Sequence, residues 1–292
     1  MKQNRLYVAT GTYSHKDYKI KESRIWLLEN GEKRLVAERP CRVVAFCSHK
    51  GVLYDASNNN VFRTLADNGG KSPISRRRSE VAGLYSHNGV LYGFGGRSIF
   101  RIPENEECED MENALDGMSG FISNFHNHNG HFYITLESFT FYSDWDIGDK
   151  GILLRLADGK SEEIDVCPHS FIGNLHSHQG ELYCTISNEI FKIPRESAFP
   201  LAVRERYIAS LCSHKGVLYD ASSGGKVFRT LEDSKGKNPI VEREDWISIL
   251  CSHDNKLYDV CCSRLSMTLE DELAYDFGEK ITAIISHKEE AE

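Results

Sequence analysis

The chain has 292 residues, of which 40% are hydrophobic and 27% charged, and this composition is typical of an ordinary folded, soluble protein. A formal net charge of −8 argues against a nucleic-acid-binding surface over the whole molecule, because phosphate recognition relies on clustered Lys and Arg. Residues 1–5 lack an apolar signal segment, and no apolar run is long enough to cross a bilayer, so we expect a cytoplasmic protein without membrane contact.

One short pattern, a His followed by a turn and a Tyr, recurs along the chain. Its first complete copy is Ser48-His49-Lys50-Gly51-Val52-Leu53-Tyr54, and its last copy, Ser286-His287-Lys288, stops before the Tyr. The anchor histidines of the pattern are separated by 38, 41, 50, 36, 39 and 34 residues, a spacing that indicates one four-stranded sheet per repeat. They are His49, His87, His128, His178, His214, His253 and His287.

The N-terminal residues supply the half that the last repeat lacks. Asn4-Arg5-Leu6-Tyr7 matches the second half of the pattern, so we expect strands at 5–10, 24–29 and 33–38 to pair with a strand at 281–287. Pairing of the first and last segments leaves no open sheet edge between them. Together with six complete repeats, this predicts a single domain over residues 1–292, all-β and built from seven sheets.

The turn after each anchor His predicts a two-residue β-hairpin. Asn88-Gly89 and Asn129-Gly130 are dipeptides that accept positive φ at both positions of a type I′ turn. In the first repeat, this register sets His49 opposite Val52, Ser48 opposite Leu53, Cys47 opposite Tyr54 and Phe46 opposite Asp55. Both faces of such a hairpin are largely apolar, so each sheet needs a neighbouring sheet on both sides.

The repeated His and Cys are interpreted as structural residues. Seven histidines on separate sheets packed about 10 Å apart do not converge on one metal ion, so we expect each to hydrogen-bond the adjacent Ser or the turn backbone. Cys47, Cys212 and Cys251 share one repeat position, which indicates packed, reduced thiols rather than disulfides. No catalytic residue, metal ligand or cofactor site is predicted from these positions.

The repeat resembles WD40 and kelch β-propellers over essentially the full chain. The double Gly typical of kelch repeats occurs once, in Leu91-Tyr92-Gly93-Phe94-Gly95-Gly96, and no repeat ends in Trp-Asp. The resemblance implies a seven-bladed β-propeller of four-stranded antiparallel blades, closed by N-terminal strands B–D pairing with C-terminal strand A. It also implies a structural network, for which we expect Asp55, Asp220 and Asp259 with Arg63 and Arg229. It implies little about function, because propellers host many activities.

Two successive repeats carry extra polar residues on the first strand, which lines the central channel of a propeller. Other repeats have small residues at these positions. The side chains are either part of a ligand or metal subsite, or they contact the cross-strand Tyr133 and Tyr183 and hydrate the channel. The residues concerned are Asn124, His126, Asn174 and His176.

Two connections between the second and third strands, at residues 10–23 and 136–150, are longer than the others and are predicted to be loops. Both combine aromatic and charged residues, as recognition surfaces do. The candidate binding residues in these loops are Tyr18, Tyr142, Asp144 and Trp145.

The sequence favours a non-enzymatic propeller that binds a protein or peptide through loops on one face. The alternative is a channel-centred hydrolase or lactonase that uses a divalent metal, with a small-molecule ligand in the channel, although the convergent carboxylates of such a site are absent from the sequence pattern. A third hypothesis, carbohydrate binding, requires equivalent exposed aromatic residues in several blades, and the repeated Tyr positions are predicted to be buried.

Overall fold

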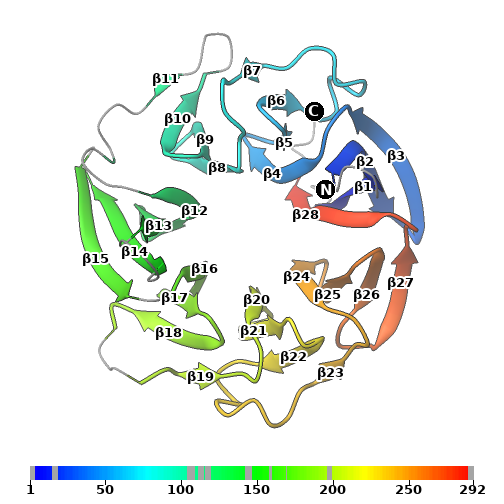
Figure 1. The fold of residues 1–292 in the computed structure, drawn as a ribbon. Coiled ribbons are helices and arrows are strands. Elements are labelled where there is room, and N and C mark those ends of the chain that lie inside the picture. Colours follow the sequence, from blue (N-terminus) through cyan, green and yellow to red (C-terminus); the bar gives the residue numbers. More distant parts are fainter. Residues whose placement is uncertain are drawn as a thin grey trace. The chain divides into compact units, whose positions relative to one another are not determined.

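The computed structural model describes residues 4–14, 19–103, 109–110, 115, 120–141, 147–157, 160–168, 170–195 and 199–288. Twenty-eight strands in these ranges form seven four-stranded antiparallel sheets (Figure 1), here called blades. The chain divides into two compact units, Met1–Asp110 with Cys251–Glu292 (unit 1) and Met111–Leu250 (unit 2). A single domain over residues 1–292 stays a prediction. Over the described ranges, no helix is long and apolar enough to span a membrane.

Unit 1 holds four of the blades. Blade 7 has the order β28 (Lys280–Lys288), β1 (Asn4–Ser14), β2 (Lys19–Glu29) and β3 (Glu32–Arg39). Blade 1 consists of β4 (Val43–His49), β5 (Val52–Ser57), β6 (Asn60–Arg63) and β7 (Ser75–Arg76). Blade 2 consists of β8 (Gly83–His87), β9 (Val90–Gly95), β10 (Ser98–Ile102) and β11 (Glu109–Asp110). Blade 6 consists of β24 (Ile247–His253), β25 (Lys256–Cys261), β26 (Arg264–Met267) and β27 (Glu272–Asp276), and the unit boundary falls inside β24.

Unit 2 holds the other three blades. Blade 3 consists of β12 (Phe121–His128), β13 (His131–Phe141), β14 (Ile147–Ala157) and β15 (Lys160–Pro168). Blade 4 consists of β16 (Ile172–His178), β17 (Glu181–Ile186), β18 (Glu189–Ile193) and β19 (Ala202–Val203). Blade 5 consists of β20 (Ile208–His214), β21 (Val217–Ser222), β22 (Lys226–Arg229) and β23 (Val241–Glu242).

The predicted closure is confirmed, because β28 pairs with β1 from Asn4 opposite Lys288 to Gly11 opposite Lys280. The blue and red strands lie side by side in one blade (Figure 1). The hairpin register is confirmed as well, with His49 opposite Val52 and Phe46 opposite Asp55. Positive φ at Lys50 and Gly51 fits the type I′ turn that the sequence predicts.

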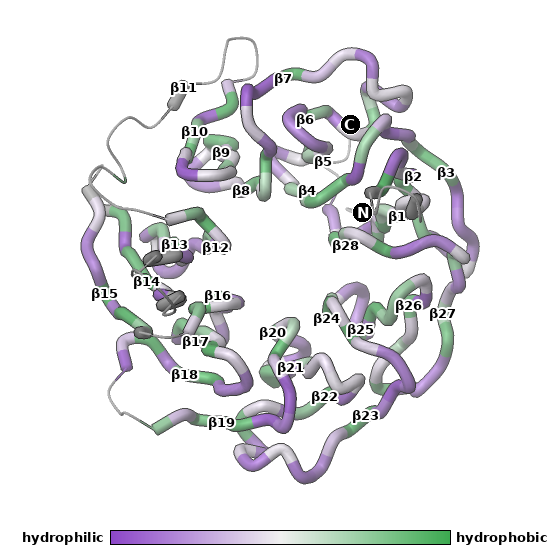
Figure 2. Tube along the Cα trace, in the orientation of Figure 1, coloured by the Kyte–Doolittle hydropathy of each residue, from purple (hydrophilic) through white to green (hydrophobic). Residues whose placement is uncertain are grey.

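The core of each blade lies on its second and third strands. Leu53, Tyr54, Val61 and Phe62 of blade 1 are each at most 2% exposed. Figure 2 shows apolar positions along strands such as β17 and β25, whereas the segments at β7 and β23 are mainly hydrophilic. Strands that are apolar on both faces are buried by neighbouring blades, as expected for sheets stacked face to face.

Within each unit, a buried ion pair joins two neighbouring blades. The Arg39 guanidinium of blade 7 donates to both Asp55 oxygens of blade 1, at 2.7 and 2.6 Å, and both side chains are fully buried. Arg204 of blade 4 bonds Asp220 of blade 5 at the same distances. The guanidinium groups stack on Phe62 and Phe228, at 4.4 and 4.3 Å from the ring centroids.

The prediction that Arg63 and Arg229 would be the partners of these aspartates is therefore wrong. Each Asp points across the blade interface, so its partner comes from the edge strand of the preceding blade rather than from its own third strand. Arg229 instead pairs with Glu232 at the surface.

The two long connections are also different from the prediction, because most of their residues belong to strands. β1 and β2 stay paired up to Ser14 opposite Lys19, and β13 and β14 up to Phe141 opposite Ile147. Only residues 15–18 and 142–146, at the tips of these hairpins, lie outside the described residues. The connections are extended two-stranded hairpins rather than loops.

Candidate functional site

The anchor histidines join neighbouring blades. In unit 1, the Nδ1 atoms of His253, His287 and His49 are hydrogen-bonded to the Oγ atoms of Ser286, Ser48 and Ser86, at 2.9, 2.9 and 2.7 Å. In unit 2, His128 and His178 bond Ser177 and Ser213 in the same way, both at 2.9 Å. The structural role is as expected, but the Ser belongs to the next blade rather than to the same hairpin.

His126 and His176, the candidate channel residues, add a second bond to the same serines. The Nε2 atoms of His126 and His176 are each 2.8 Å from Ser177 Oγ and Ser213 Oγ, respectively. The two imidazole rings lie 6.3 Å apart. Because a hydroxyl has one proton to donate and two lone pairs to accept, at most one of the two histidines on each Ser accepts O–H, and at least one donates N–H.

As predicted, His126 lies opposite Tyr133 and His176 opposite Tyr183 in the strand register, and the anchor histidines approach the same tyrosines. His128 lies 6.1 Å from Tyr133, and His178 lies 6.2 Å from Tyr183, both measured between ring centroids. The imidazoles of His126 and His176 also reach across to Ser177 and Ser213 of the following blade.

The chemistry of this pair is limited by burial. Burial lowers the pKa of His126 to about 4, with further lowering by His176 and His128, and burial followed by His178 lowers the pKa of His176 to about 4. A base with this pKa is protonated too rarely at neutral pH to serve as a general acid and is too weak for an effective general base. In addition, each Nε2 is engaged by a Ser and not open to a metal.

The two candidate asparagines do not converge with the histidines on one point. The Asn124 Oδ1 atom accepts from the backbone N–H of Phe125 at 2.8 Å, and the Asn174 Nδ2 atom donates to the carbonyl of Ile208 at 3.3 Å. Among the described residues, no group of three or more His, Cys, Asp or Glu could hold a metal ion. The other four candidates, Tyr18, Tyr142, Asp144 and Trp145, lie outside the described residues.

Unit 2 presents a different feature, a row of aromatic residues that we call the aromatic row. Four successive first strands begin with a buried Ile, and each Ile is preceded by an aromatic residue. Phe121 is 52% exposed, Tyr207 48% and Trp246 55%, and Phe171 is half-buried. In unit 1, the residues at the same repeat position are Arg42, Glu80 and Lys280, all exposed.

Contacts within unit 2 bring the members of the row together. The His–Ser bonds set β12, β16 and β20 side by side, and the backbone N–H of Leu250 donates to Ser210 Oγ at 3.0 Å, which adds the start of β24. A Cβ added at Gly173 would lie 3.5 Å from the Tyr207 hydroxyl, so Tyr207 extends over blade 4.

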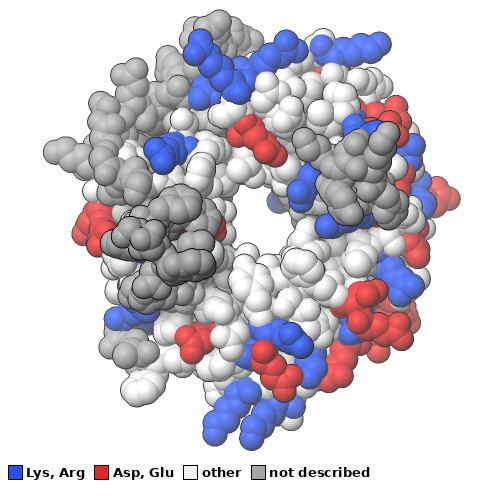
Figure 3. All heavy atoms as spheres, viewed as in Figure 1, with Lys and Arg blue, Asp and Glu red and all other residues white. Residues whose placement is uncertain are grey.

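Glu137 connects the row to blade 3. It pairs opposite Phe121, and after burial it is the next cause that raises the pKa of Tyr207. Figure 3 shows uncharged side chains over β20 and charged ones over β22. Exposed aromatic residues at one repeat position on neighbouring strands are typical of an interaction surface, whereas single exposed aromatics carry no such meaning.

The sequence contains a simple signal for this row that the repeat analysis above does not use. Each aromatic residue stands seven positions before an anchor His, in four successive repeats. The exposure of these side chains could not be predicted from the sequence, because an aromatic residue next to an Ile can belong to the core as readily as to the surface.

The sheets, their order and their closure define a seven-bladed β-propeller. The WD40 β-propeller domain of Doa1 matches with a TM-score of 0.60 and 12% identity, over 92% of this chain and 95% of that one. Sqt1 of Saccharomyces cerevisiae matches with a TM-score of 0.57 and 11% identity, over 97% and 90%. The computationally designed Ika8 protein matches with a TM-score of 0.55 and 11% identity, over 87% and 78%.

No protein-family model matches the chain, and no curated protein matches its sequence. At identities this low, the structural matches show the fold alone.

Proposed function

We propose that this propeller is a non-enzymatic interaction module that binds a protein or peptide on the face where its first strands begin. The observation that carries the proposal is the aromatic row of unit 2. Tyr and Trp are the residues most enriched at binding hot spots, because they supply a large contact area with few rotatable bonds. About half of each of the three most exposed side chains faces solvent, so this area is accessible to a partner.

The spacing of the row suits an extended polypeptide. The rings of His126 and His176, on the neighbouring first strands β12 and β16, are 6.3 Å apart, and packed sheets lie roughly 10 Å apart. An extended chain advances about 3.3 Å per residue, so neighbouring aromatics would contact side chains two or three positions apart. A peptide of about ten residues would reach all four blades that carry the row.

The hairpin candidates belong to the same proposal. β13 and β14 continue past Phe121 for the pairs from Ser138 opposite Lys150 to Phe141 opposite Ile147. Tyr142, Asp144 and Trp145 follow directly in the sequence, so we propose that they add contacts beside the row. Tyr18, in the corresponding connection of unit 1, stays a proposed contact on the same grounds of composition.

The chemistry of His126 and His176 supports this function over the hydrolase alternative. Their nitrogens are engaged by serines, and their lowered pKa values make them poor proton carriers at neutral pH. We also propose a cytoplasmic location, because the shared repeat position of Cys47, Cys212 and Cys251 is typical of packed, reduced thiols.

The test uses a displayed library of random twelve-residue peptides, selected on the wild-type protein. Enriched peptides are then measured on Trp246→Ala and Tyr207→Ala, with Leu231→Ala as the control. Leu231 is 50% exposed and lies on the connection between β22 and β23, away from the row. We expect a loss of about tenfold or more in affinity for each aromatic variant and less than about twofold for the control. Equal binding to all variants would contradict the proposal.

Carbohydrate binding is the second candidate, because the exposed equivalents in several blades that it requires are present in the row. An oligosaccharide array distinguishes the two functions. Retention of oligosaccharides by the wild type and their loss by Trp246→Ala, without any enriched peptide, would replace the peptide proposal by a carbohydrate one.

A further inference from the structure

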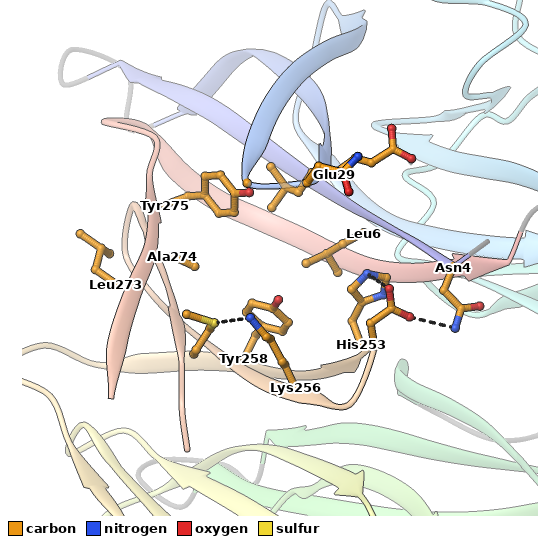
Figure 4. A pocket seen from close by; sticks show the side chains of 14 residues that line it. Asn4, Leu6, Glu29, His253, Lys256, Tyr258, Leu273, Ala274 and Tyr275 are labelled. Atoms are coloured by element: carbon orange, nitrogen blue, oxygen red, sulfur yellow. Dashed lines mark hydrogen bonds and ion pairs between the residues drawn. The ribbon is translucent and has the colours of Figure 1, made fainter. Parts of the chain in front are cut away.

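A pocket of about 410 Å³ lies between blades 6 and 7, inside unit 1. Its floor is apolar and aromatic, with Leu6 and Leu28 from blade 7 and Tyr258, Met267 and Tyr275 from blade 6. Figure 4 shows Leu6 of blade 7 on one side of the pocket and Tyr258 of blade 6 on the other, with Leu273 at the outer side. The volume falls in the range of pockets that bind small ligands or a few side chains of a peptide.

The short connection between the third and fourth strands of blade 7 lines the pocket. In blade 1, the connection at residues 64–74 crosses to the preceding blade, where the Asn68 carbonyl accepts from the backbone N–H of Glu38 at 2.7 Å. In blade 5, residues 230–240 do the same, and the Ser234 carbonyl accepts from Val203 at 2.9 Å. In blade 7, the connection is the two-residue turn Asn30-Gly31, so no such loop covers the groove beside β27.

The part of this interface next to the pocket is apolar where other interfaces hold the buried ion pair. In the strand register, Val8 and Trp26 of blade 7 take the positions that Asp55 and Phe62 take in blade 1. Phe277, which follows β27 of blade 6, takes the position that Arg39 takes in blade 7. The Trp26 and Phe277 rings lie 6.2 Å apart. Lys33 covers both rings, at 5.7 and 5.1 Å, and donates to the Asp276 carbonyl at 3.1 Å.

Carboxylates dominate the surroundings of the pocket. Asp254 and Glu29 line it, and Lys256 is the cation among its lining residues. Burial, and then Tyr275, Glu270 and Asp254, raise the pKa of Tyr258. Burial, and then Glu32, raises the pKa of Tyr275. Four acidic side chains thus act on the pocket or its two phenols.

The basic residues nearby are already engaged. Arg5 lies 3.5 Å from Glu29, and the Lys256 ammonium donates to Met267 Sδ at 3.0 Å. Aromatic rings beside carboxylates attract cations, and apolar side chains hold an aliphatic stem.

We propose that this pocket binds a short segment of a partner protein in which Lys or Arg stands next to an apolar residue. The apolar side chain would pack on Leu273, Met267 and Leu28, while the cation would lie beside Asp254 and the two tyrosines. The site is distinct from the aromatic row, since none of the row's residues lines the pocket, and it does not depend on the function proposed above.

The probe is a fluorescein-labelled peptide of sequence Gly-Leu-Lys-Leu-Arg-Leu-Gly, titrated by fluorescence polarisation. The charge-reversed peptide Gly-Leu-Glu-Leu-Asp-Leu-Gly is the control for the probe. We expect the basic peptide to bind at least about tenfold more tightly and to weaken as salt is raised.

The variants give effects of opposite sign. The Asn4 side chain donates to Asp254 at 3.1 Å, and Asp254→Asn keeps an acceptor for it. This variant should lower the affinity for the basic peptide about threefold. Lys256→Ala removes a positive charge that repels the basic peptide, and it should raise the affinity for that peptide by a similar factor. Leu273→Ala should weaken binding, whereas Leu35→Ala, an exposed position on β3 outside the pocket, should not.

Absence of binding at about 1 mM, equal binding of both peptides, or the same affinity for all four variants would overturn the proposal. A thermal melt of each variant shows that the fold is retained. A loss of basic-peptide binding in Trp246→Ala with none in Leu273→Ala would assign the peptide to the aromatic row and overturn this site alone.

Discussion

Ser177 and Ser213 of unit 2 are each hydrogen-bonded to two histidines, and the titration of His126 and His176 makes the stability of the protein depend on pH. Burial lowers the pKa of His126 and His176 to about 4 in the folded protein, while the ordinary value is 6.5. Between these values, the unfolded chain binds more protons than the folded one, so the free energy of unfolding falls as pH is lowered from about 6.5 to about 4. From pH 7 to pH 5, the loss is about 2 kcal/mol for each histidine.

Urea unfolding at pH 7 and pH 5 measures this loss. The double variant His126→Gln, His176→Gln keeps a polar group toward Ser177 and Ser213 but cannot titrate, so its stability should fall much less on acidification. His131→Gln, at an exposed position, is the control and should behave as the wild type. An identical pH dependence in the double variant would show that other groups carry the effect.

At this scale, the sequence predicts contacts within a hairpin and misses contacts between blades. The pairing of His49 with Val52 follows from a two-residue turn, because the side-chain period of two leaves no other register. The partners of His128 and Asp220 lie 49 and 16 residues away along the chain. No local rule connects such residues, since their proximity depends on how two sheets pack.

Among the elements, the extended hairpins show why the two long connections are predicted as loops. β28 pairs with β1 only as far as Gly11, so Thr12 to Ser14 face β2 alone. A two-stranded ribbon has no sheet packed on either face, so its residues need not alternate between apolar and polar types. The sequence pattern of such a ribbon is therefore close to that of a loop. The strands that can be predicted from the sequence are those that are buried within a blade.

The connections between third and fourth strands allow a test of how much the crossing loops contribute. Gly236 has φ of +63°, and an added Cβ would lie 2.9 Å from the carbonyl oxygen of Val203. Gly278 has φ of +66°, and an added Cβ would meet nothing within 4 Å. Both positions thus share the same backbone strain on substitution, but only Gly236 packs against the preceding blade.

Gly278→Ala should lower the free energy of unfolding by about 1 kcal/mol, the cost of a left-handed conformation with a side chain. Gly236→Ala should lower it by about 2 to 3 kcal/mol, because the loop must also move away from Val203. Urea unfolding of both variants gives the difference. Equal losses would mean that the loop does not hold its place on the preceding blade.

For the whole molecule, the number of blades and the closure follow from the sequence, because each repeat builds one sheet and the truncated seventh copy has its complement in Asn4 to Tyr7. The functional surface does not follow in the same way. The aromatic row and the pocket are departures from the repeat, the first in side-chain type and the second in loop length. A repeat pattern identifies what the blades share, whereas binding depends on what distinguishes them.

The closure itself can be tested by removing β28. A protein that ends at Glu279 loses the partner strand of Leu6, Tyr7, Val8 and Ala9, which are at most 2% exposed, and two His–Ser bonds, those of His287 and Ser286. We expect it to lack the cooperative unfolding transition of the full chain and to aggregate through the exposed edge of β1. A synthetic peptide of residues 280–288, added in excess, should restore a transition whose midpoint rises with peptide concentration, because binding to the folded state alone stabilises it. If the shortened protein melts at the temperature of the full chain, and the peptide has no effect, then pairing of the chain ends does not hold blade 7 together.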